Sequence, residues 1–119
     1  MTLQPDIAKV LLYTGAALST GIASLSAGFG EGYTAGATAK AVMRQPKAND
    51  ILLRSMLISQ AVTESGAIFA LVISMLLIFG GFTDAGIDWA KAFSFLGAGL
   101  AMGLGCTGPN FGSGYSGAI

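Results

Sequence analysis

The chain has 119 residues, with six basic and six acidic side chains, no His and a single Cys. Its charged fraction of 10% and mean hydropathy of +0.70 exclude an ordinary water-soluble domain and indicate a membrane protein. A net charge of zero gives no basic surface for nucleic acid. Cys106 has no partner for an internal disulfide or a Cys-based metal cluster, so we interpret it as a small packed side chain.

Three long apolar segments follow one another, at residues 10–39, 56–79 and 92–119. Each exceeds the roughly 20 residues that an α-helix needs to cross a bilayer. We therefore predict an all-α membrane protein. Residues 1–82 should form a transmembrane hairpin, with helices at about 8–43 and 51–80 and a turn at 44–50, and residues 83–119 the Gly-rich first helix of a second, incomplete repeat.

The first segment carries small residues at every fourth position: Ala16, Thr20, Ser24, Gly28, Gly32 and Gly36. Such a stripe lets another helix backbone approach closely, which matters in lipid because the hydrophobic effect does not drive helices together there. Glycines concentrate around Glu31, so we predict helix packing at Gly28, Gly30, Gly32 and Gly36. This concentration favours a dense assembly over a generic packing motif.

The connections between the segments predict the orientation of the chain in the membrane. The first connection is basic, with Lys40, Arg44 and Lys47, and Arg54 follows shortly after it. The positive-inside rule therefore places this turn in the cytoplasm. The second connection, residues 80–89, has two acids and a Trp, which suits the opposite side of the membrane.

Glu64 is the only charge in the second apolar segment and lies deep within it. A charged group at such a depth costs roughly 2.5–3.5 kcal/mol on insertion scales, so intramembrane carboxylates usually serve ion chemistry. The alternative is a structural polar contact between helices. Gln60 lies one turn earlier on the same face, where it either hydrogen-bonds to Glu64 or packs against a neighbouring helix.

An internal repeat links the first and third segments. A shift of about 82 residues without gaps places Phe29-Gly30-Glu31-Gly32-Tyr33 on Phe111-Gly112-Ser113-Gly114-Tyr115. In this motif only the acid is replaced, by Ser113. Because Ile119 would end inside the hydrocarbon layer, we expect the natural chain to continue as a fused double hairpin.

Three motifs occur together in the order Gly-rich helix, polar turn and acidic helix: GFGEGY at 28–33, RQP at 44–46 and QAVTES at 60–65. In these motifs the chain resembles the ring-forming c subunit of F-type ATP synthases. The resemblance covers about residues 8–79 as one hairpin, with a further half-repeat after it. It implies a ring in which the Gly-rich helix lies inside and the Glu-bearing helix outside.

The resemblance also implies function and partners. Glu64 would carry an ion past the arginine of the stator a subunit, and Arg44, Gln45 and Pro46 would contact the central stalk. The protein would be non-catalytic and would form a homo-oligomeric c ring in lipid, without nucleic acid, in a bacterial inner (plasma) membrane. No catalytic nucleophile, phosphate-binding loop or metal cluster is visible in the sequence, so ATP chemistry would belong to partner subunits.

The residues around Glu64 favour Na⁺ over H⁺ as the transported ion, with no cofactor. In sodium-coupled relatives, the positions that match Glu31, Val62, Glu64 and Ser65 supply the ligands, Val62 through its carbonyl, and hard cations generally prefer such oxygens. Two more polar side chains belong to the predicted site, Thr63 and Gln60. Two carboxylates in one site repel each other, so we expect them to share one proton while Na⁺ is bound.

Two positions depart from the sodium-coupled pattern: Gly66 stands where many such relatives have Thr, and Phe69 where several have Tyr. Two alternatives to an F-type rotor protein also stay open. One is a vacuolar or archaeal-type rotor proteolipid, which the double-hairpin pattern suggests. The other is a non-rotary membrane channel or assembly proteolipid, which would need no selective ion site and should tolerate Glu64→Gln.

Overall fold

The computed structural model describes residues 4–82 and 87–119, so part of the predicted acidic connection, residues 83–86, lies outside the described residues. The described residues form α1 (Pro5–Arg44), the short 3-10 helix η1 (Pro46–Ala48), α2 (Asn49–Phe79), α3 (Trp89–Gly105) and α4 (Thr107–Gly117). These residues include no extended strand. The prediction of an all-α protein is confirmed.

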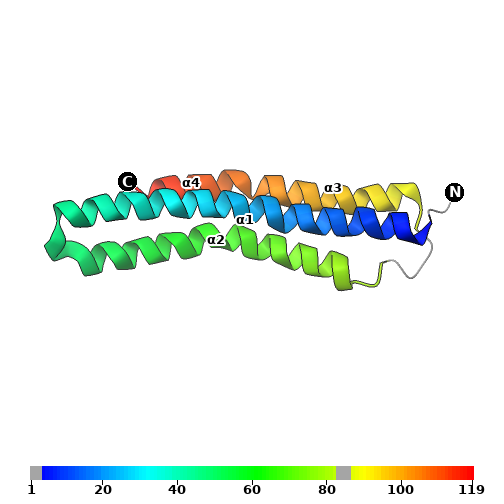
Figure 1. Ribbon diagram of the computed structural model, residues 1–119, viewed down its shortest axis with the longest axis horizontal. Coiled ribbons are helices and arrows are strands. Elements are labelled where there is room, and N and C mark those ends of the chain that lie inside the picture. The colour runs from blue at the N-terminus through cyan, green and yellow to red at the C-terminus, as the bar shows by residue number, and fades with distance from the viewer. Residues whose placement is uncertain (1–3, 83–86) are drawn as a thin grey trace.

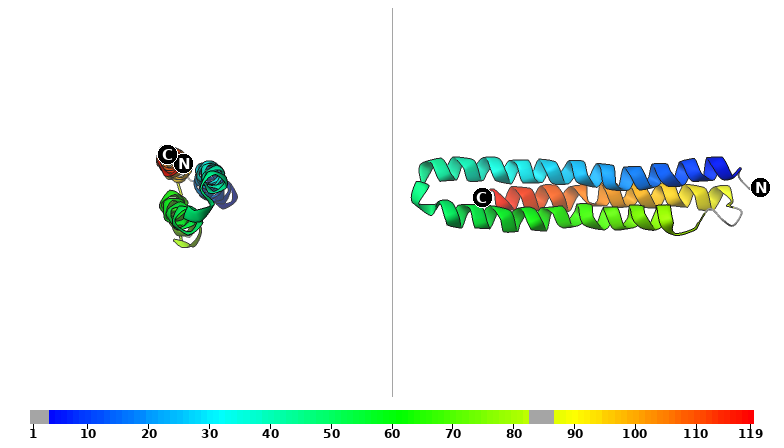
Figure 2. Two further views of the ribbon diagram at one scale, coloured as in Figure 1. Left: turned by 90° about the vertical axis from the view of Figure 1, so that its left-hand side faces the viewer. Right: turned by 60° about the horizontal axis from the view of Figure 1, so that its bottom comes forward.

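The helices form a long three-rod bundle (Figures 1 and 2). α2 runs antiparallel to α1, while α3 and α4 lie end to end beside them and run in the direction of α1. The bundle measures 67 × 19 × 15 Å. Three helical stretches are long and apolar enough to cross a membrane, Asp6–Arg44, Pro46–Phe79 and Trp89–Gly117.

Small and hydroxyl-bearing side chains fill the centre of the bundle, while large apolar side chains point outward. Leu12 is the largest fully buried side chain, and Ser19, Thr34 and Thr63 are buried beside Ala residues. By contrast, side chains such as Phe29 are mostly exposed. This distribution is typical of membrane helices, because lipid solvates apolar groups well and close packing holds the helices together.

Glycine brings the backbones of α1 and α3–α4 into direct contact at several levels, of which two are the closest. A Cβ atom added to Gly99 would collide with the backbone of Gly15, and one added to Gly114 would collide with the backbone of Gly30. At both levels only a hydrogen atom fits between the helices. The two repeats therefore approach as closely as helices can.

Of the four glycines predicted to pack, the structure places Gly30 between helices of this chain. At Gly28, Gly32 and Gly36, an added Cβ would have no atom within 4 Å among the described residues. These three glycines lie on the exposed side of α1. Their stripe is free for a neighbour outside the chain.

The two repeats lie side by side in register. Phe29 stacks on Phe111 with ring centroids 6.2 Å apart, and Tyr33 stacks on Tyr115 at 5.7 Å. The numbers in each pair differ by 82, which is the shift that aligns the repeats in the sequence. Equivalent residues of α1 and α4 therefore sit at the same depth in the bundle.

The third apolar segment is broken at Cys106, where the sequence pattern predicts one continuous helix. Pro109 causes the break, because it has no N–H to donate to the carbonyl of Gly105 four residues earlier. The helical bonds on either side persist, from Cys106 N to Met102 O and from Asn110 N to Cys106 O, both 3.1 Å. The break is therefore local, and α3 and α4 still follow one line (Figure 1).

Candidate functional site

Hydroxyl groups join α2 to α1 in the middle of the bundle. Ser19 Oγ donates to the carbonyl of Ala70 at 3.1 Å, and Ser74 Oγ donates to the carbonyl of Ala16 at 2.6 Å. Thr20 Oγ1 and Ser74 Oγ are also 2.6 Å apart. In a bilayer no water competes for these partners, so the bonds hold the two helices in one axial register.

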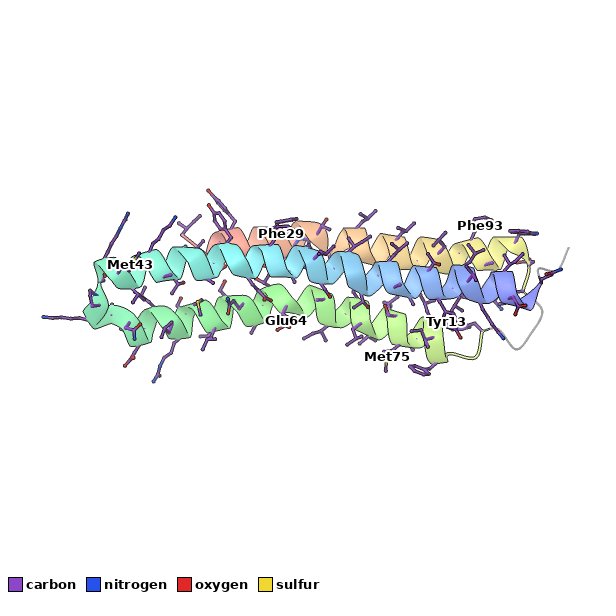
Figure 3. All side chains as sticks on the ribbon, viewed as in Figure 1. Tyr13, Phe29, Met43, Glu64, Met75 and Phe93 are labelled. Carbon is purple, nitrogen blue, oxygen red and sulfur yellow. The ribbon has the colours of Figure 1, made fainter. Side chains whose placement is uncertain are left out.

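This register places Glu64 across from Glu31. Glu64 is the central residue of α2 and is exposed, as Figure 3 shows, while Glu31 on α1 is partly buried. Gln60 Nε2 donates to the backbone carbonyl of Glu31 at 3.4 Å, and Glu64 follows Gln60 by one turn of α2. Gln60, Glu64 and Glu31 thus gather at the seam between α1 and α2.

Val62 and Ser65 line a different surface, a groove of about 340 Å³ between α2 and the α3–α4 rod. Gly66 and Phe69 of α2 lie along the same groove, as does Ser113 of α4. The contacts in the structure do not join Val62 or Ser65 to Glu31. The four predicted sodium ligands are therefore divided between the α1–α2 seam and this groove.

Thr63 points into the bundle between these two surfaces. Its Oγ1 donates to the carbonyl of Ser59 at 3.0 Å and accepts from Ser113 Oγ at 2.9 Å. Ser113 occupies the position that Glu31 has in the first repeat. The second repeat therefore presents a hydroxyl group to α2 where the first presents a carboxylate.

Asn110 is a functional candidate that the sequence reasoning missed. It is 1% exposed, and its Nδ2 donates to the carbonyl of Ala23 at 3.1 Å and to Ser26 Oγ at 2.8 Å, both on α1. Its Oδ1 lies against Gly66 of α2. The available signal was the repeat itself, because Asn110 aligns with Gly28 and a buried amide there must find partners on neighbouring helices.

We expect Gly66→Ala to loosen α4 from α2. The new methyl would lie 2.5 Å from Asn110 Oδ1, and two hydrogen bonds to α1 keep that amide from moving away. Overpacking of this kind costs about 1–3 kcal/mol. Thermal unfolding in detergent measures the loss. Gly108→Ala is the control, because its Cβ would have no atom within 4 Å; equal destabilisation by both variants would contradict the explanation.

The chemistry that these side chains offer is oxygen ligation and proton exchange. Among residues 4–82 and 87–119, no group of three or more His, Cys, Asp or Glu could hold a metal ion. Cys106 is buried and donates its thiol hydrogen to the carbonyl of Gly66 at 3.2 Å. Carboxylate, hydroxyl and amide oxygens suit a hard cation or a proton.

The predicted stalk-contact residues lie at the end of the hairpin, away from the carboxylates. Arg44 ends α1, Gln45 leaves the helical conformation with φ −134° and ψ 70°, and Pro46 begins η1. A residue before proline avoids the helical region, which explains why α1 ends here. All three residues are exposed, and Glu64 lies 15 residues into α2, about 22 Å along its axis.

Comparison with known proteins finds a family model and relatives that all carry the same name. The family model for the ATP synthase C subunit matches residues 14–77. The chain is 45% identical over 74 residues to the ATP synthase c subunit of Alkaliphilus oremlandii, covering 60% of this chain and 84% of that protein. It is 39% identical over 75 residues to the second ATP synthase c subunit of Cereibacter sphaeroides, covering 63% and 90%.

The matched segment takes in most of α1, the turn and nearly all of α2, so it contains both Glu31 and Glu64. It covers more than half of the chain, and the relatives are covered over most of their length. The resemblance to the c subunit of F-type ATP synthases is thereby confirmed. This chain belongs to the family of ATP synthase c subunits.

Proposed function

We propose that this non-catalytic protein carries ions in the rotor ring, with Glu64 as the group that binds and releases each ion. The observation that carries the proposal is the position of Glu64 at the centre of α2, exposed and the only charged residue in the segment 56–79. A carboxylate at mid-membrane is stable only when its charge is neutralised. Binding and release of a cation would switch Glu64 between a state that tolerates lipid and one that does not.

We propose Na⁺ as the transported ion, with H⁺ as the competitor. The second carboxylate supports Na⁺, because the hydrogen bond from Gln60 to the Glu31 carbonyl brings Glu31 beside the turn of α2 that ends at Glu64. One shared proton and one Na⁺ together neutralise two carboxylates. A proton-coupled site, by contrast, needs only one carboxylate, which a single proton neutralises. Ser65 supports the same conclusion, since its Oγ donates to the carbonyl of Val62 at 2.7 Å and leaves its lone pairs for a cation.

The proposed mechanism requires partners at two places on the protein, at Glu64 and at the turn between α1 and α2. Exchange at Glu64 requires a stator a subunit outside the ring, and the exposed turn at Arg44, Gln45 and Pro46 provides the surface for the central stalk. The free glycine stripe of α1 supports a homo-oligomeric ring surrounded by lipid. The relatives' bacterial sources support a bacterial inner membrane as the location.

A hydrophobic carbodiimide, which reacts with protonated carboxyl groups in apolar surroundings, tests the proposal directly. We expect it to modify Glu64 in the purified assembly, and we expect NaCl to suppress the modification relative to choline chloride. Because Na⁺ and protons compete for one site, suppression should weaken as the pH falls. Mass spectrometry of the labelled chain locates and quantifies the adduct.

Three outcomes separate the alternatives. Labelling of Glu64 that Na⁺ suppresses supports a sodium-coupled rotor. Labelling that depends on pH but not on Na⁺ supports a proton-coupled rotor and contradicts the choice of Na⁺. Absence of labelling at Glu64 under all conditions contradicts the ion-carrier function itself.

A further inference from the structure

The joint between the two repeats, where α1 meets α4 within the chain, depends on positions that lack a side chain. A Cβ atom added to Gly30 would collide with the backbone carbonyl of Asn110, and one added to Gly114 would collide with the backbone of Gly30. Thr34 Oγ1 donates across the same joint to the carbonyl of Gly114 at 2.8 Å. Two glycines and one hydroxyl group therefore define this contact.

The same features occur a second time on the exposed faces of α1 and α4. The shift of 82 residues carries the buried Gly30 onto Gly112, and in reverse it carries the buried Gly114 onto Gly32. Gly112 and Gly32 are both exposed, and a Cβ added to either would have no atom of the described residues within 4 Å. Ser116 is exposed as well and aligns with Thr34, so the hydroxyl group is also repeated.

The stacked aromatic pairs also have surface left for a further neighbour. Phe29 is 67% exposed and Phe111 is 51% exposed, although each stacks on the other. Tyr33 and Tyr115 are 58% and 59% exposed in the same situation. An aromatic ring has two faces that can stack, and one face of each ring is occupied within the chain. The second faces are available to rings of another molecule.

We propose that α4 of one copy packs against α1 of the next copy as it packs against α1 of its own chain, with Gly112 against Gly32 and no displacement along the axis. The inference rests on the ring form of the proposed function and specifies how its copies join. Ser116 Oγ then donates to the Gly32 carbonyl of the next copy. The stacked phenylalanines and tyrosines continue from copy to copy as two aromatic belts.

A second copy of this chain is the occupant that these faces fit, because each face is equivalent to the buried face of the other helix. The joint within the chain shows that the two kinds of face are complementary. A contact between different faces of identical chains can be repeated from copy to copy until a ring closes. Close backbone approach through glycine is also the usual way in which helices associate in lipid.

The joint between copies differs from the joint within the chain at two positions. Ala17 stands where α3 has Gly99, which meets the backbone of Gly15 within the chain, so the copies lie farther apart at that level. Gly28 stands where α4 has Asn110, so the two hydrogen bonds from that amide to α1 have no counterpart. The glycine contact and the aromatic belts therefore hold the copies together.

Two chains with one new cysteine each test the pairing. One carries Phe29→Cys, the other carries Phe111→Cys, and both carry Cys106→Ser to remove the native thiol. We expect a short bifunctional thiol reagent to produce dimers in synthase assembled from both chains, and no dimers when either chain is used alone. Equal positions on adjacent copies are two helix spacings apart, roughly 16–20 Å, which is too far for the reagent. Gel electrophoresis and mass spectrometry identify the dimers.

Leu25→Cys is the control for depth. Leu25 lies one turn from Phe29 on the exposed side of α1, about 6 Å along the axis. Paired with Phe111→Cys, it should form dimers more slowly than Phe29→Cys does. Equal or faster cross-linking at Leu25 would contradict a joint without axial displacement.

Gly112→Ala tests the glycine contact without new cysteines. Its methyl group touches no described atom of its own chain, so the bundle of a single chain should keep its stability. By the equivalence of the joints, the methyl group would collide with the Gly28 carbonyl of the next copy, and we expect size-exclusion chromatography in mild detergent to show loss of the ring. Gly108→Ala is the control, because the aligned residue of α1 is Ser26, whose Cβ fits the joint within the chain. This variant should still form the ring.

The inference is overturned if the mixed chains give no dimers, if Phe111→Cys alone is cross-linked to itself as in a two-fold contact, or if Gly112→Ala assembles like the wild type. A face covered by lipid alone would give the first and third of these results. Failure of the rotor function gives a different result, namely the expected dimers and ring together with a Glu64 that carbodiimide does not label.

Discussion

Replacing Glu64 by Gln should abolish ion-coupled ATP synthesis and ATP-driven ion uptake in vesicles that contain the whole synthase. Gln has nearly the same shape as Glu, so packing around the centre of α2 should change little. It carries no charge at any physiological pH and therefore cannot alternate between an ion-bound and an ion-free state. We expect transport to fall to the background of vesicles without the enzyme, while the variant protein still assembles.

Glu31→Gln is the matched control for this experiment, because it removes the other carboxylate at the same level of the bundle. Gln keeps a side-chain oxygen, so we expect transport to persist, with a pH dependence that changes because the shared proton is gone. Ion uptake measured by a Na⁺-sensitive or pH-sensitive dye inside the vesicles gives both results. Undiminished coupled transport by Glu64→Gln would favour a channel or assembly proteolipid that needs no ion site.

The second large effect is expected from Gly114→Ala. The new Cβ would collide with backbone atoms of Gly30, which cannot rotate away as a side chain can. α4 would have to move off α1, which would also break the hydrogen bond from Thr34 to the Gly114 carbonyl. Together these losses should destabilise the bundle by roughly 3 kcal/mol or more, and the ring should not form.

Gly112→Ala makes this prediction specific, because it adds the same methyl two residues away on the same helix. No atom of the described residues lies within 4 Å of that Cβ. Alanine also has the higher helix propensity, by about 1 kcal/mol, so stability should be unchanged or slightly higher. Unfolding by SDS, followed by circular dichroism, compares the two variants. Similar stability of both would contradict the backbone contact between Gly30 and Gly114.

The sequence predicted the features that depend on composition and spacing along one helix. The apolar segments and Glu64 were visible because a bilayer imposes a length and penalises charge. The repeat identified Phe29 and Phe111 as equivalent positions, while their stacking against each other is a finding of the structure. The match to ATP synthase relatives confirms the family that the motifs indicated.

The features that depend on contacts between helices were not visible in the same way. Asn110 is notable because its side chain hydrogen-bonds to Ala23 and Ser26, which lie more than 80 residues away in the chain. Which glycines meet a backbone depends on the rotation of each helix about its axis, so Gly114 could not be distinguished from Gly112. The break before Pro109 was the exception, because proline's missing N–H is a local property that the apolar pattern concealed.

The equal depth of the two repeats determines what kind of assembly can grow from them. When identical units join head to tail, any translation along the axis at each step produces an open spiral, whereas rotation alone closes on itself. In this chain, the stacked pairs Phe29–Phe111 and Tyr33–Tyr115 place the second repeat beside the first at the same depth, so the step from one repeat to the next has no axial rise. A rotor built with this step keeps each carrier group at one height as it turns, so a stationary partner meets every group at the same place.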